Sequence, residues 1–597
     1  MDSQKNENLL NLALQTPEAE RERSLELNVG YDEQERTWEV IVKYHDSLER
    51  LAQWGIVAEE MIAGYAILTV PESEIERLAE VEEIEYVEKP KRLFFSDLSG
   101  NTASCYAPGS PISQELTGKD VLVAVIDSGI SYYNRDFRNE DGTTRIVYLW
   151  DQVLNREFSA EQINEALAAG SRAAAEQLVP SMDISGHGTA VAGIAAGNGG
   201  DRGQAYAGMA RESGLLIVRL GEPKEDSFPR TTELMRALTY VVKKAVELKM
   251  PVAVNLSFGN TYGAHNGTSL LERFINNVSE IGRSVICVGS GNEGASGGHV
   301  GGSVRLERMG SYKVTNSVNQ TDANVDGQDV RVEMTVGAYE RGLNVQLWKE
   351  YTDRFLVTLV SPSGERFQVD TDRPGKQIYR LQQTQILLYN GEPAPYMTPQ
   401  EIYFDFLPVL GESYLDQGVW TFVLRPVRIT TGNYTFYLPS SSVRNANTRF
   451  VRTTPDVTLT IPSTAGNVIT VGAYDPVYEA YADFSGRGYL YQEQVNSRTS
   501  DTYVKPDLVA PGVGVIAPDR DGGYSPVTGT SFAAPFATGA AALLMQWGIV
   551  MGNDPYLYGE KVKAYLRKGA QPIRGVAEYP DSKVGYGALC VEDSLPG

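Results

Sequence analysis

Ser531 lies in segment 529–535, Gly-Thr-Ser-Phe-Ala-Ala-Pro, which combines a hydroxyl with small neighbours. A serine attacks an amide carbonyl only when a base removes its proton and donors stabilise the oxyanion. The Ala-rich apolar run 532–545 predicts a helix, so we expect Ser531 at a helix N-terminus, where backbone N–H groups favour negative charge. The same residues could form an ordinary helix N-cap, so this segment alone leaves catalysis and capping open.

Two other segments carry a carboxylate and an imidazole in suitable settings. The apolar run 121–126 has strand length and stops at Asp127, as a buried parallel strand does. His187 stands between Gly186 and Gly188 at the start of a predicted small-residue helix, and the chain has only four histidines. A carboxylate at such a strand end is well placed to orient an imidazole, which can serve a serine as its base.

The order Asp127, His187, Ser531 along the chain is one of three orders in which unrelated folds carry the same carboxylate–imidazole–hydroxyl triad. With their flanking residues, the three segments resemble the signature motifs of the subtilases, the subtilisin-like serine peptidases. The resemblance implies a serine endopeptidase with an Asp-His-Ser triad, a protein or peptide substrate and no cofactor. The alternation of apolar strands with helices predicts an α/β fold, a subtilisin-like doubly wound parallel sheet with the site at the carboxyl edge of its strands.

The subtilase resemblance also assigns binding groups. Segment 285–294 resembles the family strand that ends in the oxyanion-hole asparagine, here Asn292, whose amide would act beside the Ser531 N–H. An ordinary Gly-Asn turn is the alternative. The backbone that binds substrate is assigned to Ser257, Phe258 and Gly259 in one segment and to Gly289, Ser290 and Gly291 in another.

Residues 1–96 are expected to form an N-terminal α+β domain. Strands are predicted at 37–44 and 64–70 and from residue 85, with helical stretches at 47–54 and 72–81, and the first 30 residues are predicted as a polar tail or charged helix. This pattern resembles the subtilase propeptide, an intramolecular chaperone and inhibitor that leaves its tail in the active site. Self-cleavage is then expected near Ser96 or Asp97, within 94–100, whereas an N-terminal domain that is never removed is the alternative.

An insertion separates the two parts of the predicted peptidase domain, 97–303 and 453–597. Between them, in 304–452, short runs with period-2 alternation predict a jelly-roll-like β-sandwich. This arrangement resembles the Csp proteases of clostridia and related Firmicutes, in which active members cleave the pro-form of a spore-cortex hydrolase during germination. Other members have lost catalytic residues, so a catalytically quiet regulator or binding module is one alternative, and a general degradative protease is another.

Composition limits the partners. The net charge of −23 over 597 residues argues against nucleic acid and anionic membrane surfaces. No secretory signal is visible at residues 1–8 and no apolar run of about 18 residues is present, so we expect no membrane span and synthesis in the cytoplasm, with the resemblance adding association with spores. Three scattered cysteines and the short loop 198–203, which lacks the length of the family's calcium loop, predict no obligatory metal.

Overall fold

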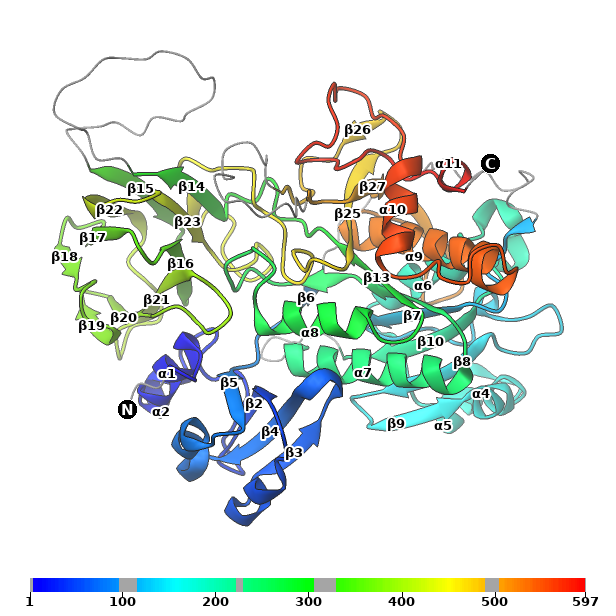
Figure 1. Cartoon of the computed structure of the whole chain (residues 1–597), viewed down its shortest axis with the longest axis horizontal. Coiled ribbons are helices and arrows are strands. Elements are labelled where there is room, and N and C mark those ends of the chain that lie inside the picture. The colour runs from blue at the N-terminus through cyan, green and yellow to red at the C-terminus, as the bar shows by residue number, and fades with distance from the viewer. Residues whose placement is uncertain (1–3, 96–114, 222–228, 305–328, 489–503, 596–597) are drawn as a thin grey trace.

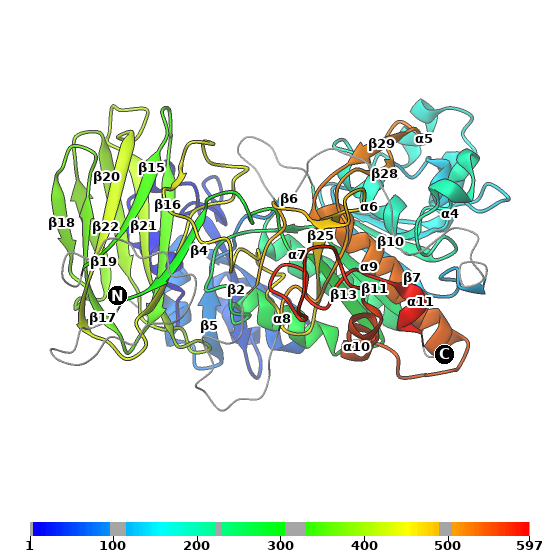
Figure 2. The ribbon, with the colours of Figure 1, turned by 90° about the horizontal axis from the view of Figure 1, so that it is seen from above.

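The computed structural model describes residues 4–95, 115–221, 229–304, 329–488 and 504–595. Figure 1 shows three packed bodies: a central sheet with helices on both faces, a small N-terminal domain, and a sandwich of two sheets. Seen from above, the sandwich lies at one end of the long axis and the central sheet toward the other (Figure 2).

The central sheet has nine strands, of which the interior ones are parallel. Along it the order is β26-β25-β13-β11-β7-β10-β8-β9, with β27 paired to β25, and only the pairs with β26 and β9 are antiparallel. The strands are β7 (Leu122–Asp127), β8 (Ile146–Asp151), β9 (Arg156–Ser159), β10 (Gly214–Arg219), β11 (Val252–Leu256), β13 (Ser284–Gly289), β25 (Ile469–Asp475), β26 (Ala480–Tyr481) and β27 (Leu508–Pro511).

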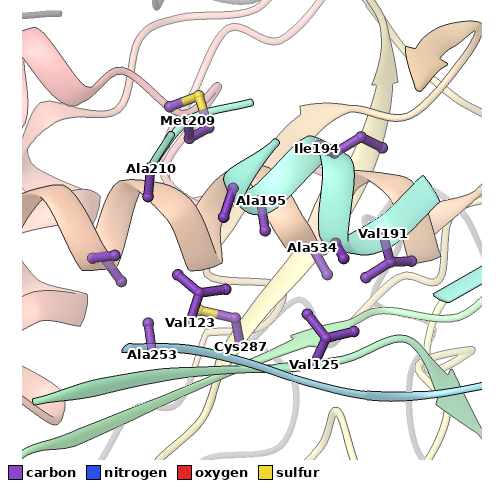
Figure 3. Packing of buried hydrophobic residues seen from close by; sticks show 14 of the residues in the cluster. Val123, Val125, Val191, Ile194, Ala195, Met209, Ala210, Ala253, Cys287 and Ala534 are labelled. Atoms are coloured by element: carbon purple, nitrogen blue, oxygen red, sulfur yellow. The ribbon is translucent and has the colours of Figure 1, made fainter. Parts of the chain in front are cut away.

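Both faces of this sheet are covered, as the continuous apolar strands require. Val123 and Val125 of β7 pack against α6 (His187–Ala196) and α9 (Thr530–Met545), as Figure 3 shows for the small side chains between them. The alternate residues Leu122 and Ala124 pack on the other face in the cluster that includes α7 (Thr231–Leu248) and α8 (Leu270–Ser279). The predicted doubly wound α/β architecture is confirmed.

Helix α9 runs through the interior of this body. Among the described residues, one helix is long and apolar enough to cross a membrane, Thr530–Val550, although no membrane span was expected from the sequence. However, 78% of its most apolar window is buried inside the protein, as is typical of a core helix. Figure 1 shows α9 between the sheet and α10 (Glu560–Gly569).

The N-terminal domain is an antiparallel sheet with the order β1-β2-β4-β3 and β5 on β2. Its strands are β1 (Tyr31–Asp32), β2 (Thr37–Tyr44), β3 (Val57–Glu60), β4 (Tyr65–Pro71) and β5 (Ile84–Glu88). The two predicted helical stretches are 3-10 helices, η1 (Glu49–Trp54) and η3 (Glu72–Glu80), and β3 was not predicted.

The first 30 residues are not a free tail. They contain α1 (Asn8–Leu14) and α2 (Glu18–Arg21), and the α1 side chains Leu9, Leu10 and Leu12 are buried. These side chains share one apolar cluster with the N-terminal sheet and with Leu387 and Tyr389 of the sandwich. The segment therefore joins two bodies whose sequences lie some 300 residues apart.

The sandwich consists of two antiparallel sheets that enclose one apolar core, including Phe404, Trp420 and Phe436. One sheet has the order β14 (His299–Ser303), β23 (Asn433–Tyr437), β16 (Leu343–Glu350), β21 (Pro399–Pro408), β20 (Thr384–Asn390) and β19 (Gly375–Arg380). The other has β18 (Arg366–Val369), β17 (Arg354–Val360), β22 (Gly418–Arg428), β15 (Val330–Val336) and β24 (Arg449–Phe450). Strand β14 precedes residue 304 but belongs here, because it pairs with β23.

Shorter elements complete the described chain. Between Asp127 and His187 the chain forms two short helices, with Gly170 in a left-handed conformation between them. These elements are α4 (Ala160–Leu167), α5 (Arg172–Leu178), α11 (Val591–Ser594), β6 (Phe94–Phe95), β12 (Phe258–Gly259), β28 (Val515–Pro518), β29 (Tyr524–Val527), the 3-10 helices η2 (Ile62–Gly64), η4 (Arg135–Phe137), η5 (Gly200–Arg202) and η6 (Gln204–Tyr206), and the π-helix η8 (Gln546–Val550).

Buried acidic side chains gather where the three bodies meet. Lys91 pairs with Glu7 at 2.8 Å and with Glu88 at 3.2 Å, and Glu88 also accepts the N–H of Leu270 at the start of α8. Glu401 of β21 is buried beside them. Burial raises the pKa of Glu401 to about 8, with the charge of Glu7 adding to the rise and Lys91 opposing it. Glu401 therefore keeps its proton in the folded protein near neutral pH.

We predict that folding becomes less favourable as pH rises from 5 to 7, partly because of Glu401. Its folded-state pKa of about 8 exceeds the ordinary 4.5, so its contribution is complete below pH 4.5 and is lost as pH rises toward 8. Replacing it with the neutral isostere, Glu401→Gln, should flatten the dependence of Tm on pH over this range. Glu412→Gln, at an exposed site of the same sandwich, should leave the slope unchanged. Equal slopes for Glu401→Gln and wild type would contradict the assignment.

Candidate active site

Asp127 and His187 are joined by a short hydrogen bond at the carboxyl end of the sheet. Asp127 is the last residue of β7, His187 is the first of α6, and Nδ1 lies 2.6 Å from Oδ1. Burial raises the pKa of Asp127, while the imidazole and the Ser128 N–H, 2.7 Å away, oppose the rise. A carboxylate on Nδ1 favours the tautomer with its proton there, which leaves Nε2 as the basic ring nitrogen.

Gly188 allows α6 to approach the end of β7. A Cβ atom at Gly188 would lie 2.2 Å from the carbonyl oxygen of Gly129 and 3.2 Å from the Cβ of Asp127. Any larger residue would push the helix away and lengthen the contact between His187 and Asp127. The glycine after the histidine is therefore part of the geometry of the site.

Asp183 fixes the first turn of α6, a role that the sequence analysis missed. Its buried carboxylate accepts the N–H groups of Gly186 and Thr189 at 2.9 and 2.8 Å, and the Thr189 hydroxyl at 2.6 Å. It also accepts the hydroxyl of Ser128, whose oxygen receives the N–H of Gly188. The strand end with Asp127 and the helix with His187 are thus held by one carboxylate. An acid four residues before the histidine was the available signal.

Ser531 is the second residue of α9 and is buried beside His187's helix. Its hydroxyl donates to the backbone carbonyl of Ser257 at 2.8 Å, and the Ser257 hydroxyl donates to the Ser531 carbonyl at 2.8 Å. The ring of the next residue, Phe532, lies 5.2 Å from the imidazole of His187, centroid to centroid. The structure therefore brings Ser531 to the site, with the hydroxyl turned toward Ser257 and not toward His187.

The side chain of Asn292 is oriented by hydrogen bonds with Thr530. Its Oδ1 accepts both the N–H and the hydroxyl of Thr530 at 3.1 Å. The Thr530 hydroxyl also accepts the N–H of Gly291 at 3.1 Å. Because the carbonyl end of the side chain faces Thr530, the NH₂ end is directed elsewhere and can donate to a developing oxyanion next to Ser531. Thr530 was not predicted as a site residue.

The predicted substrate-binding segments leave neighbouring strands. Ser257, Phe258 and Gly259 follow β11, while Gly289 ends β13 and Ser290 and Gly291 follow it; β11 and β13 are a parallel pair. Asn255 donates to the Ser257 hydroxyl at 2.8 Å, and Thr538 of α9 donates to Asn255 at 3.0 Å. This buried chain of hydrogen bonds holds the first segment against the helix that carries Ser531.

The end of the N-terminal domain lies along the first segment. Strand β6 pairs antiparallel with β12, Phe95 opposite Phe258 and Phe94 opposite Gly259. Upstream, Leu93 donates its N–H to Pro229 at 2.7 Å, and Asn260 donates to the Arg92 carbonyl at 3.1 Å. The predicted cleavage residues, Ser96 and Asp97, lie outside the described residues.

Among the described residues there is no group of three or more His, Cys, Asp or Glu side chains that could hold a metal ion. Two of the other three histidines, His265 and His299, are buried, and they stack on Tyr437 at 3.9 and 4.6 Å, respectively. Burial lowers the pKa of each to about 4. They are neutral packing groups away from Asp127.

Two family models match this chain. The family model "Csp protease B prodomain" matches residues 4–91, and the model "Subtilase family" matches residues 118–394 and 429–587. The solved structure of the Clostridium perfringens CspB protease is similar to this chain with a TM-score of 0.70 and 32% identity, covering 80% of this chain and 93% of that one.

Two other relatives are either less identical in sequence or match this chain over a shorter stretch. The PII-type proteinase of Lacticaseibacillus paracasei is 23% identical over 543 residues, which is 84% of this chain and 27% of the relative. Serine protease AprX of Bacillus subtilis is 32% identical over 161 residues, 24% of this chain and 32% of AprX. This chain thus spans less than a third of either relative. Because the subtilase model matches more than half of the chain, this protein belongs to the subtilase family and carries a Csp-type prodomain.

Proposed function

We propose that this protein is a serine endopeptidase that uses Asp127, His187 and Ser531 as its catalytic triad and is made as a zymogen that cleaves itself near Ser96. The pairing of β6 with β12 is the observation that carries the proposal. It lays the end of the prodomain on a backbone segment whose Ser257 carbonyl is 2.8 Å from the Ser531 hydroxyl. The described part of this segment ends at Phe95, whose partner Phe258 is the residue after Ser257.

The chemistry follows from the atoms at the site. The Ser531 hydroxyl turns from Ser257 to Nε2 of His187, which takes its proton as Oγ attacks the scissile carbonyl. Asp127 holds the resulting imidazolium through the 2.6 Å contact. The Asn292 amide and the Ser531 N–H receive the oxyanion, His187 then protonates the leaving amine, and water hydrolyses the acyl-enzyme by the reverse sequence.

One observation favours a second candidate, a catalytically quiet regulator. The Ser531 hydroxyl donates to Ser257 and not to His187. A fluorophosphonate, which reacts only with an activated serine, separates the two functions. Labelling of wild type but not of Ser531→Ala supports the enzyme, and a lack of labelling in both supports the regulator.

The natural substrate is proposed from the Csp-type prodomain and the similarity to the CspB protease. We propose limited proteolysis of a protein such as the pro-form of a spore-cortex hydrolase, in a spore-associated setting. A dedicated processing enzyme should cut such a proenzyme at one position and be poor on casein. A general degradative protease should degrade unfolded casein readily, and this result would contradict limited proteolysis.

Self-processing is tested with purified wild type and Ser531→Ala by intact mass and N-terminal sequencing. We expect wild type to split within 94–100, because the prodomain tail lies beside the nucleophile, and Ser531→Ala to remain at 65.4 kDa. Ser525→Ala removes an exposed hydroxyl that donates to Asp519, and this variant should be cleaved like wild type. Two intact proteins, or cleavage of Ser531→Ala itself, would refute self-processing by Ser531.

Asn292→Ala should lower kcat by about 10²–10³-fold with KM nearly unchanged, because the lost amide acts on the oxyanion and not on the bound substrate. Steady-state kinetics on a peptide substrate measure this split. Asn266→Ala, at an exposed asparagine, is the matched control and should retain wild-type kcat. A rise in KM without a fall in kcat would assign Asn292 to substrate binding instead.

A further inference from the structure

A cavity of about 410 Å³ opens at the edge of the central sheet that lies away from the candidate active site. Its lining comes from residues 242–252, at the end of α7 and the start of β11, and from residues 281–284, between α8 and β13. Figure 1 shows α7 and α8 side by side on one face of the sheet. Strands β11 and β13 run parallel, and the substrate-binding segments leave their other ends. Pockets for small molecules measure about 300–1,000 Å³, so this α7–α8 cavity has room for a small ligand.

The floor of the α7–α8 cavity is apolar. Val242 and Ala245 of α7 and Val252 of β11 are each at most 4% exposed, and Ile281 is half-buried beside them. At the rim, Val246 presents its side chain to solvent and is 54% exposed. A ligand that enters therefore buries hydrocarbon against hydrocarbon, which favours a molecule that is apolar over most of its length.

Two cationic side chains, Lys249 and Arg283, line the mouth of the cavity. Both are exposed, and within the described ranges neither forms an ion pair with an acid. The helix ends beside them do not need these charges, because their last carbonyls are already bonded. The carbonyl of Val246 accepts the Lys249 N–H at 3.1 Å, and the Ser284 hydroxyl donates to the Ile281 carbonyl at 3.1 Å. In a chain of net charge −23, two unpaired cations beside an apolar floor are complementary to an anionic head group.

The N-terminal domain leaves the mouth of the cavity open. It contacts α7 through Glu59 and Arg236 at 2.6 Å, and it contacts α8 through Tyr65 and Asn277 at 3.2 Å. Both contacts precede the lining residues along their helices. Gly282 at the rim is exposed and adds no side chain. A ligand can therefore reach the cavity in the full chain, before or after any cleavage of the prodomain.

We propose that the α7–α8 cavity binds a medium-chain fatty acid, with the carboxylate between Lys249 and Arg283 and the hydrocarbon chain on the apolar floor. An acyl chain fits better than a peptide, because a peptide would bring N–H and carbonyl groups that the floor leaves without partners. The hydroxyl of Ser284, the polar side chain at the floor, is already bonded within its own turn. This site is independent of the proposed function, since it lies at the opposite edge of the sheet.

The test titrates the full chain with sodium octanoate, decanoate and dodecanoate in a calorimeter, below the concentrations at which they form micelles. We expect one site, with a Kd that tightens about tenfold or more for each added pair of methylenes, because each methylene buries apolar surface. Dodecyltrimethylammonium carries the same chain with the opposite charge, so it should bind at least about tenfold more weakly. Equal affinity for the two dodecyl compounds, or no binding of dodecanoate, would overturn the proposal.

Variants of the rim locate the binding. Lys249→Gln and Arg283→Gln should each weaken dodecanoate binding about tenfold, because each removes a charge-assisted hydrogen bond. Lys243→Gln, at an exposed lysine of α7 outside the lining, should leave Kd unchanged. Val246→Trp should fill the mouth and abolish binding, whereas Val477→Trp, at an equally exposed valine far along the chain, should not.

The glutamine variants keep the test decisive if Val246→Trp lowers Tm. Dodecanoate that binds both glutamine variants, or a folded Val246→Trp, with wild-type affinity occupies another place and refutes the site. Binding to phosphatidylglycerol vesicles without binding of free dodecanoate also refutes it, because the surface would then recognise a membrane and not a fatty acid.

Discussion

The 2.6 Å contact between His187 and Asp127 requires a helix terminus to be held against a strand end, and much of the molecule is arranged around this requirement. Small residues make the approach possible. Gly188 passes the carbonyl of Gly129 without a Cβ, and Gly539 lets α9 approach the carbonyl of Ala195 in α6. Close packing brings the two helices onto one face of the sheet, so that His187 and Ser531 begin helices that share a core.

Asp183 fixes the position of the first turn of α6 relative to the end of β7. A buried carboxylate that accepts several N–H and hydroxyl groups is costly to move, because each displaced partner would lose its hydrogen bond in a dry environment. Its bonds reach Ser128 on one side and Thr189 on the other. The relative position of Asp127 and His187 thus depends on a second acid, Asp183.

Much of this could be predicted from local sequence. The triad segments are short and have distinctive neighbours. The sandwich could be predicted because apolar and polar residues alternate along its strands, as in β15, where Val332, Met334 and Val336 are buried. Features made by contacts between distant segments could not be predicted. The polar first 30 residues contain leucines that become buried only against the N-terminal sheet and the sandwich, which are distant in sequence.

The sandwich supports the substrate groove from two directions. Gln346 of β16 accepts the N–H of Gly263 at 3.0 Å and donates to the Thr261 carbonyl at 3.1 Å, bracing the loop directly after β12. On its far side, the chain leaves β24 at Phe450 and reaches Thr460 ten residues later. The insertion therefore contacts the loop after one substrate-binding segment through Gln346 and continues along the chain to Thr460, which donates its N–H to Ser290 of the other segment.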